Sequence, residues 1–117
     1  MALDYHIVPY QSEWTDLTTT NATAVFTALD QTFPTASHLH IGNDGAGSST
    51  VTVEIYDASA TATFVFCYQL VIFEKGCLEL DMHNMRLDVD DEIRVTAGDA
   101  NFLHAFVTVI ESAGRSG

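Results

Sequence analysis

The sequence has few basic residues. Only four of its 117 residues are Lys or Arg, against 16 Asp and Glu, and the formal net charge is −12. A surface with this charge repels the phosphate backbones of DNA and RNA, because binding them requires clusters of Lys and Arg. We therefore expect no nucleic-acid partner.

Long hydrophobic runs are also missing. The longest, Phe64–Phe73, is interrupted only by Gln69 and is about half as long as the roughly 20 apolar residues that a membrane-spanning helix needs. The segment Met1–Tyr10 contains Asp4 and no Lys or Arg, so it lacks the basic start of a secretory signal. The sequence thus predicts a protein that is made in the cytoplasm and has no membrane partner.

Cysteine is scarce, and the common catalytic motifs are missing. Cys67 and Cys77 form no Cys-x-x-Cys pair, so the sequence predicts free thiols and no cysteine-only zinc site. It contains neither a Gly-x-Ser-x-Gly nucleophile motif nor a glycine-rich phosphate loop. We therefore expect a protein that is not an enzyme and needs no cofactor.

What the sequence does have is a strand-like alternation of apolar and polar residues. In the segment Thr50–Tyr56, Val51, Val53 and Ile55 alternate with polar residues, which is typical of a strand with one face in a core. The spacing of such segments predicts an all-β protein, an antiparallel β-sandwich of about seven or eight strands. Comparable segments are Ser37–Asn43, Cys77–Met82, Leu87–Asp91, Ile93–Val95 and Phe102–Glu111.

This pattern divides the chain into three parts. Residues 1–20 contain aromatic residues and a threonine run without clear alternation, and they are interpreted as an N-terminal arm. Residues 21–111 are predicted to form the β-sandwich domain, and residues 112–117 a flexible C-terminal tail.

The predicted arm carries the candidate interface residues, Tyr5, Tyr10 and Trp14. The arm is too short to have a core of its own, so these aromatic side chains need another surface to pack against. We predict that this surface belongs to a partner. The alternative is that the arm folds back over its own sandwich.

His38 and His40 are the candidate metal ligands. Histidines two apart on a strand share a face and can bind one metal ion, and the pair is similar to one that the cupin family uses. Cupins place a Glu soon after the pair, whereas the next Glu here is Glu54. The sequence therefore favours a polar strand face without a metal, and a cupin-like metal-binding enzyme using His38 and His40 is the alternative function.

Asp88, Asp90, Asp91 and Glu92 form an acidic cluster. Carboxylates can bind calcium, but the run matches only the first steps of a calcium-binding EF-hand loop. A solvated turn is expected.

Five motifs follow one another along the chain. They are an expected hairpin around Asn43–Ser49, the apolar strand from Phe64, the glycine turn into Cys77–Leu80, the acidic turn and strand Asp90–Val95, and the closing strand ending in Val109–Glu111. This order resembles small jelly-roll β-sandwich virion proteins of tailed bacteriophages, of the capsid cement or decoration type. The resemblance covers Ala36–Glu111. Where the family has Gly-Asp before an Ile-Arg-Val strand, this sequence has Asp91-Glu92.

The resemblance implies a non-enzymatic structural protein. Such a protein binds the major capsid protein on the exterior of the virion and stabilises its lattice as a symmetric oligomer, with a trimer expected. An oligomer would also bury the strands from Phe64 and Phe102, which are apolar on both faces. The alternative location is the neck, tail or fibre of a phage, where the same sandwich also serves.

Overall fold

The structure is a computed structural model that describes residues 10–29 and 34–111. These residues contain no helix that could cross a membrane. They form eight strands: β1 (Tyr10–Asp16), β2 (Thr23–Thr27), β3 (Pro34–Asn43), β4 (Ser49–Asp57), β5 (Ala62–Ile72), β6 (Cys77–Arg86), β7 (Glu92–Ala97) and β8 (Leu103–Glu111).

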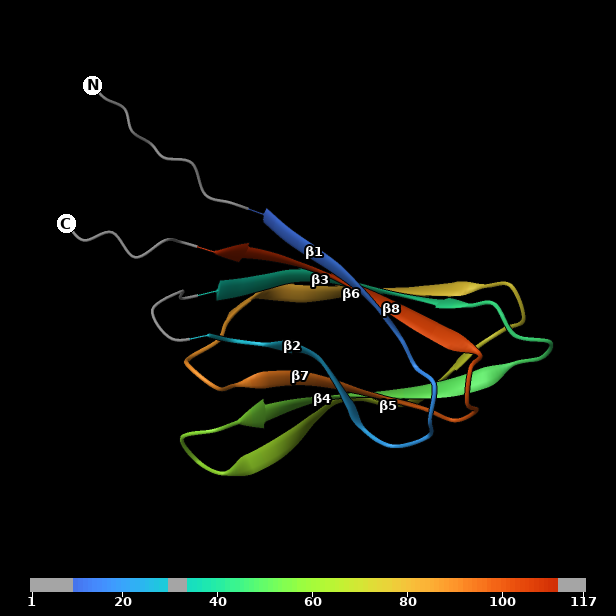
Figure 1. Cartoon of the computed structure of the whole chain (residues 1–117), viewed down its shortest axis with the longest axis horizontal. Coiled ribbons are helices and arrows are strands. Elements are labelled where there is room, and N and C mark those ends of the chain that lie inside the picture. The colour runs from blue at the N-terminus through green and yellow to red at the C-terminus, as the bar shows by residue number, and fades with distance from the viewer. Residues whose placement is uncertain (1–9, 30–33, 112–117) are drawn as a thin grey trace, which may run out of the picture.

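The strands form two antiparallel sheets that face each other (Figure 1). The first sheet has the order β1-β8-β3-β6, and the second has the order β2-β7-β4-β5. The first strand therefore pairs with the last, the second with the seventh, the third with the sixth and the fourth with the fifth. This nested pairing is that of a jelly roll. The predicted all-β sandwich of jelly-roll type is confirmed.

The core lies between the sheets and comes from alternate residues of each strand. Leu39 and Ile41 of β3 and Val51 and Val53 of β4 are fully buried, as the alternation predicts. Complete burial of one such side chain contributes about 1.5–3 kcal/mol to folding. On β8 the odd-numbered residues enter the core, namely Leu103, Ala105, Val107 and Val109.

The sandwich begins earlier than residue 21. Tyr10–Asp16, which the sequence assigns to the arm, pairs with β8 over its whole length as β1. Leu17, which follows, is only 1% exposed and belongs to the core. This segment lacks apolar alternation because β1 is an edge strand that is held by its ladder to β8. Residues 1–9 of the predicted arm and the predicted tail 112–117 lie outside the described residues.

The predicted hairpin around Asn43–Ser49 is wrong. The strands on either side of this loop lie in different sheets, since β3 pairs with β6 and β8 while β4 pairs with β5 and β7. Asn43 shapes the loop: its Oδ1 accepts a hydrogen bond from the Gly45 N–H at 2.8 Å, and its Nδ2 donates to the carbonyl oxygens of Gly47 and Ile72, both at 2.9 Å. Turn residues between two strands do not reveal which sheet each strand joins.

The acidic segment Leu87–Asp91 is a loop and not the predicted short strand. Asp91 is only 8% exposed. Its two carboxylate oxygens accept hydrogen bonds from the backbone N–H groups of Ala58 and Asp88, both at 2.9 Å, and its carbonyl oxygen accepts one from Ala28 at 2.9 Å. The expectation of a solvated turn therefore fails for Asp91, which joins three separate loops at one end of the sandwich.

We expect Asp91→Ala to lower the free energy of unfolding by about 1–3 kcal/mol, because two backbone N–H groups lose their acceptor. Thermal or denaturant unfolding measures the change. Asp99→Ala is the matched control, since it removes the same charge from an exposed turn and should change stability very little. Equal effects of the two substitutions would show that net charge, and not the hydrogen bonds, is responsible.

Candidate functional site

The outer face of the first sheet carries a row of side chains from all four of its strands. Trp14 of β1 lies directly opposite Phe106 of β8, which lies opposite His40 of β3, which lies opposite Glu79 of β6. Directly opposed residues project from the same face of a sheet. The register therefore brings into one line residues that are far apart in the sequence.

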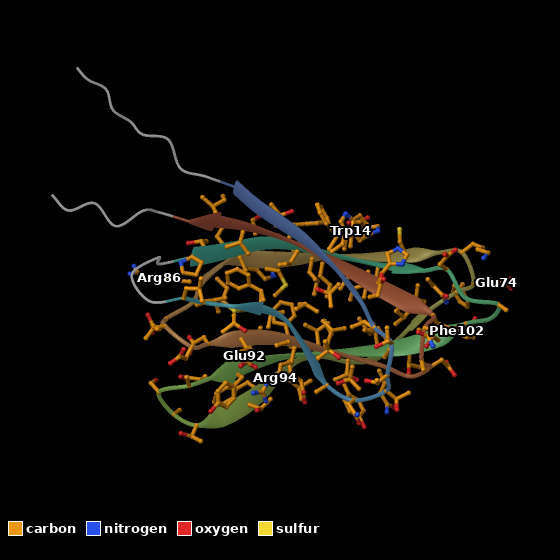
Figure 2. All side chains as sticks on the ribbon, in the orientation of Figure 1. Trp14, Glu74, Arg86, Glu92, Arg94 and Phe102 are labelled. Carbon is orange, nitrogen blue, oxygen red and sulfur yellow. The ribbon has the colours of Figure 1, made fainter. Side chains whose placement is uncertain are left out.

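Trp14 stands on this outer face, away from the space between the sheets (Figure 2). Its side chain is 58% exposed. Its ring centroid lies 4.5 Å from that of Phe106, 5.2 Å from that of His104 and 6.0 Å from that of His40. Trp14 is thus a surface aromatic residue that rests on neighbours of its own sheet and leaves more than half of its area open.

The interface role predicted for the three aromatic residues stays a prediction. Of these residues, only Trp14 has a described side chain. Tyr10 is the first residue of β1, and Tyr5 lies outside the described residues.

His38, His40 and Glu79 form a compact hydrogen-bonded group. His38 Nε2 lies 2.5 Å from one carboxylate oxygen of Glu79, and His40 Nδ1 lies 2.6 Å from the other. Hydrogen bonds from His38 and His40 hold the pKa of Glu79 below its ordinary value, because they stabilise the charged carboxylate. The carboxylate that the sequence lacks close to the histidine pair is thus supplied by β6.

Sequence reasoning missed Glu79 and Cys77 as neighbours of His40. The alternation in β6 shows that Cys77 and Glu79 face away from the core, as His40 does on β3. What it does not show is that β3 and β6 are adjacent in the sheet, with Glu79 opposite His40 and Cys77 opposite Gly42. Both cysteines are free, as predicted; Cys77 is exposed and Cys67 is half-buried.

Gly42 makes room for His104 on the same face. A Cβ atom at position 42 would lie only 2.8 Å from His104 Nε2. The His104 ring therefore lies over the backbone of β3, where any larger residue would displace it. This places His104 between Trp14 and β3.

A second candidate surface lies on β5 and the residue that follows it; β5 is one of the two edge strands of the second sheet in the described part of the chain. It consists of large apolar side chains that are 36–72% exposed, and we call it the β5 surface. Its members are Phe64, Val65, Tyr68, Leu70, Val71 and Phe73.

The apolar run predicts that the strand either bends or changes sheet near Gln69, and β5 is indeed irregular there. Gln69 has a φ of 48° and its N–H donates a hydrogen bond to Thr52 Oγ1 at 3.0 Å. The pairing with β4 shifts register on both sides of Val53. The chain stays in the second sheet, so of the two alternatives the change of sheet does not occur. Apolar side chains are exposed on both faces of β5: Leu70 lies opposite the buried Val51, and Val71 lies opposite Thr50.

A small cleft lies at the end of the sandwich opposite to Asp91, with a volume of about 210 Å³. Pockets that enclose small-molecule ligands are usually about 300–1,000 Å³ and mostly apolar, so this cleft is smaller than a typical substrate pocket. Its lining includes Asp16, Thr18, Asp44, Asn101, Phe102 and His104.

The solved structures that share this fold include two that match nearly the whole chain. One is a protein of Bacillus endospore appendages, which are disulfide-linked pili; it has a TM-score of 0.59 and 13% identity, covering 98% of this chain and 100% of its own. The other comes from the acid-stable capsid of Helicobacter pylori bacteriophage KHP30; it has a TM-score of 0.59 and 7% identity, covering 95% of this chain and 92% of its own. No protein-family model matches the sequence, and no curated protein matches it. At these identities the likeness establishes the jelly-roll fold.

We expect an NMR titration to give Glu79 a pKa below that of an ordinary glutamate, and to show it rising in the double variant His38→Ala, His40→Ala. Because the pKa is lowered in the folded state, the stabilisation is present above the unfolded-state pKa and is lost as the pH falls through the folded-state pKa. His83→Ala is the control, since His83 pairs with Asp81 and not with Glu79. An unchanged pKa in the double variant would contradict the role of the two histidines.

Proposed function

We propose that this chain is a structural protein of a virus particle, and specifically a cement or decoration protein of a tailed bacteriophage. In this role it binds the major capsid protein on the outside of the shell as a symmetric oligomer, with three copies as the expected number. The observation that carries the proposal is the β5 surface. A large exposed apolar surface on a small sandwich is characteristic of a protein that associates with other chains.

The β5 surface suits contact with a second copy of the chain. Edge strands present unpaired backbone N–H and C=O groups, and natural proteins usually protect them with charges or proline. Among the exposed residues of β5 there is no charged side chain and no proline. Edge pairing or face packing between copies would remove the apolar side chains from water, and a closed symmetric oligomer would do so for every copy.

The net charge of the chain supports a position on the outside of the capsid shell. A net charge of −12 keeps free copies apart and repels DNA, so the protein gains nothing from contact with a packaged genome. Association must therefore come from apolar contact, which the β5 surface supplies, or from basic patches on the partner.

The comparisons support an assembly role through the use that other proteins make of this fold. One neighbour is part of a phage capsid and the other part of a pilus. Capsids and pili are both built from many copies of their subunits. In such lattices each contact is modest, and repetition by symmetry makes the total large.

The row around Trp14 is the surface that we assign to contact with the capsid. It lies on the first sheet, away from the β5 surface on the second, so that one molecule can contact its own copies and the shell at the same time. Tyr5 and Tyr10 would extend this contact from the N-terminal segment. Partly exposed aromatic residues of this kind are frequent anchors of interfaces.

Two measurements on the full-length chain test the proposal. Light scattering gives the number of copies, and sedimentation with empty shells of the major capsid protein from the same virus gives binding. We expect a trimer that sediments with the shells. A ring of six or twelve copies that ignores the shells would replace the cement role with one in the neck or tail. A monomer that does not bind would overturn the proposal altogether.

Val71→Asp should weaken self-association at least tenfold, which corresponds to about 1.4 kcal/mol, because it places a charge within the β5 surface. Sedimentation equilibrium measures the dissociation constant, and a thermal melt confirms that the sandwich is intact. Val89→Asp is the control, because Val89 is 48% exposed, close to the 54% of Val71, but lies in the β6–β7 loop. Equal weakening by both variants would assign the effect to added charge and not to the β5 surface.

Trp14→Ala should weaken binding to shells by about 2–4 kcal/mol, the usual loss for an aromatic anchor, while the trimer and the melting temperature change little. Co-sedimentation at a series of protein concentrations measures the loss. Trp14→Phe, which keeps an aromatic ring, should restore part of the binding. A large fall in melting temperature for Trp14→Ala would instead give Trp14 a role in holding the first sheet together.

A further inference from the structure

Three side chains with different metal-binding atoms meet on the outer face of the first sheet. His40 Nδ1, Cys77 Sγ and a carboxylate oxygen of Glu79 all lie within 4.8 Å of one another. The strand register brings these side chains close together. Glu79 lies opposite His40, and Cys77 lies two residues before Glu79 on the same face of β6. The capsid contact proposed above includes the row in which His40 and Glu79 lie, but it gives their metal-binding atoms no role.

The distances suit a common ion. Glu79 Oε2 lies 2.6 Å from His40 Nδ1 and 3.8 Å from Cys77 Sγ. In a tetrahedral zinc site, with bonds of about 2.0–2.1 Å to nitrogen and oxygen and about 2.3 Å to sulfur, neighbouring donor atoms lie roughly 3.3–3.6 Å apart. The two observed distances fall on either side of this range. Small rotations of partly exposed side chains would therefore bring all three donors to one ion without moving the backbone.

We propose that His40, Cys77 and Glu79 bind a zinc ion on the surface of this sheet. Imidazole nitrogen, thiolate sulfur and carboxylate oxygen are the three donor types of zinc sites, and three protein donors leave one tetrahedral position for water. Calcium and magnesium prefer oxygen ligands alone, so the presence of Cys77 and His40 selects against them. The strongly negative chain also raises the local concentration of cations.

His38 has a positioning role in this site. Its Nε2 lies 2.5 Å from the Glu79 oxygen that is not shared with His40. A hydrogen bond to the second oxygen fixes the orientation of a metal-binding carboxylate, and loss of such a bond typically costs 10–100-fold in affinity. His38 therefore supports Glu79 and does not itself bind the ion.

The site differs from the cupin-like alternative that the histidine pair suggests. His38 and His40 project outward, while the residues next to His40, Leu39 and Ile41, fill the space between the sheets. The proposed ion thus lies on an open surface. The proposal is a binding site on a structural protein and does not require an enclosed reaction pocket.

Cobalt(II), a spectroscopic substitute for zinc, is the probe, and the sample is the reduced full-length chain. Ligation by Cys77 gives a thiolate-to-cobalt absorption band in the near ultraviolet. Trp14 is the only tryptophan in the chain, and its ring centroid lies 6.0 Å from that of His40, so bound cobalt should also quench its fluorescence. We expect one ion per chain, with both signals rising together. Added zinc should abolish the band and restore the fluorescence.

The chain offers a matched control for each ligand. Cys77→Ser, His40→Ala and Glu79→Gln should each weaken cobalt binding at least tenfold. His38→Ala should weaken it by about tenfold and leave the absorption band in place. The control substitutions replace the same residue types outside the site and should leave the affinity unchanged; they are Cys67→Ser, His83→Ala and Glu74→Gln.

Three results would overturn the proposal. One is cobalt binding without a thiolate band, another is equal weakening by Cys77→Ser and Cys67→Ser, and the third is no saturable binding at all. In each case His40, Cys77 and Glu79 would not together form a metal site. The site does not depend on the capsid role, because cobalt binding is measured on the isolated chain.

Discussion

The pairing of β8 with β1 on one side and β3 on the other is the interaction on which the rest of the structure depends. The odd-numbered residues of β8 fill the centre of the core, and its even-numbered residues lie on the outer face. Phe106 is thereby fixed between Trp14 and His40. A shift of one residue in this register would exchange the two faces and expose the core residues of β8. The surface that carries Trp14 and the histidines is therefore specified by the same ladder that specifies the core.

Much of the sandwich could be predicted from the sequence, because alternation of apolar and polar residues is a local signal. It identifies β3, β4, β6, β7 and β8 and correctly separates buried Leu39 from outward-facing His40. The signal fails for β1, whose sequence has no such alternation, and for the loop after Asn43, since nothing local says that β3 and β4 belong to different sheets. The group of His40, Cys77 and Glu79 could not be predicted from the sequence for the same reason. Each residue could be assigned to a face, but the adjacency of β3 and β6 is a property of the whole topology.

The two candidate surfaces differ in chemistry and lie on different sheets. The β5 surface is apolar and belongs to the second sheet, whereas the outer face of the first sheet combines one tryptophan with histidines, a thiol and carboxylates. Apolar contacts depend mainly on the area removed from water, whereas interactions of exposed polar and charged groups depend more on ionic conditions. A jelly roll separates these two kinds of surface without enlarging the domain, because each sheet contributes only one of its faces to the core.

The nested order of the strands also affects the way the chain can fold during synthesis. The hairpin β4–β5 is complete once Ile72 has been made, but β1 has no partner in the sheet until the ribosome has produced β8. The first strand must therefore remain unpaired until β8 has been made. Chains dominated by such distant contacts fold slowly, because the entropy of closing a long loop is lost before the contacts form. Nascent copies thus pass through a period in which the core is open to water and to other nascent copies.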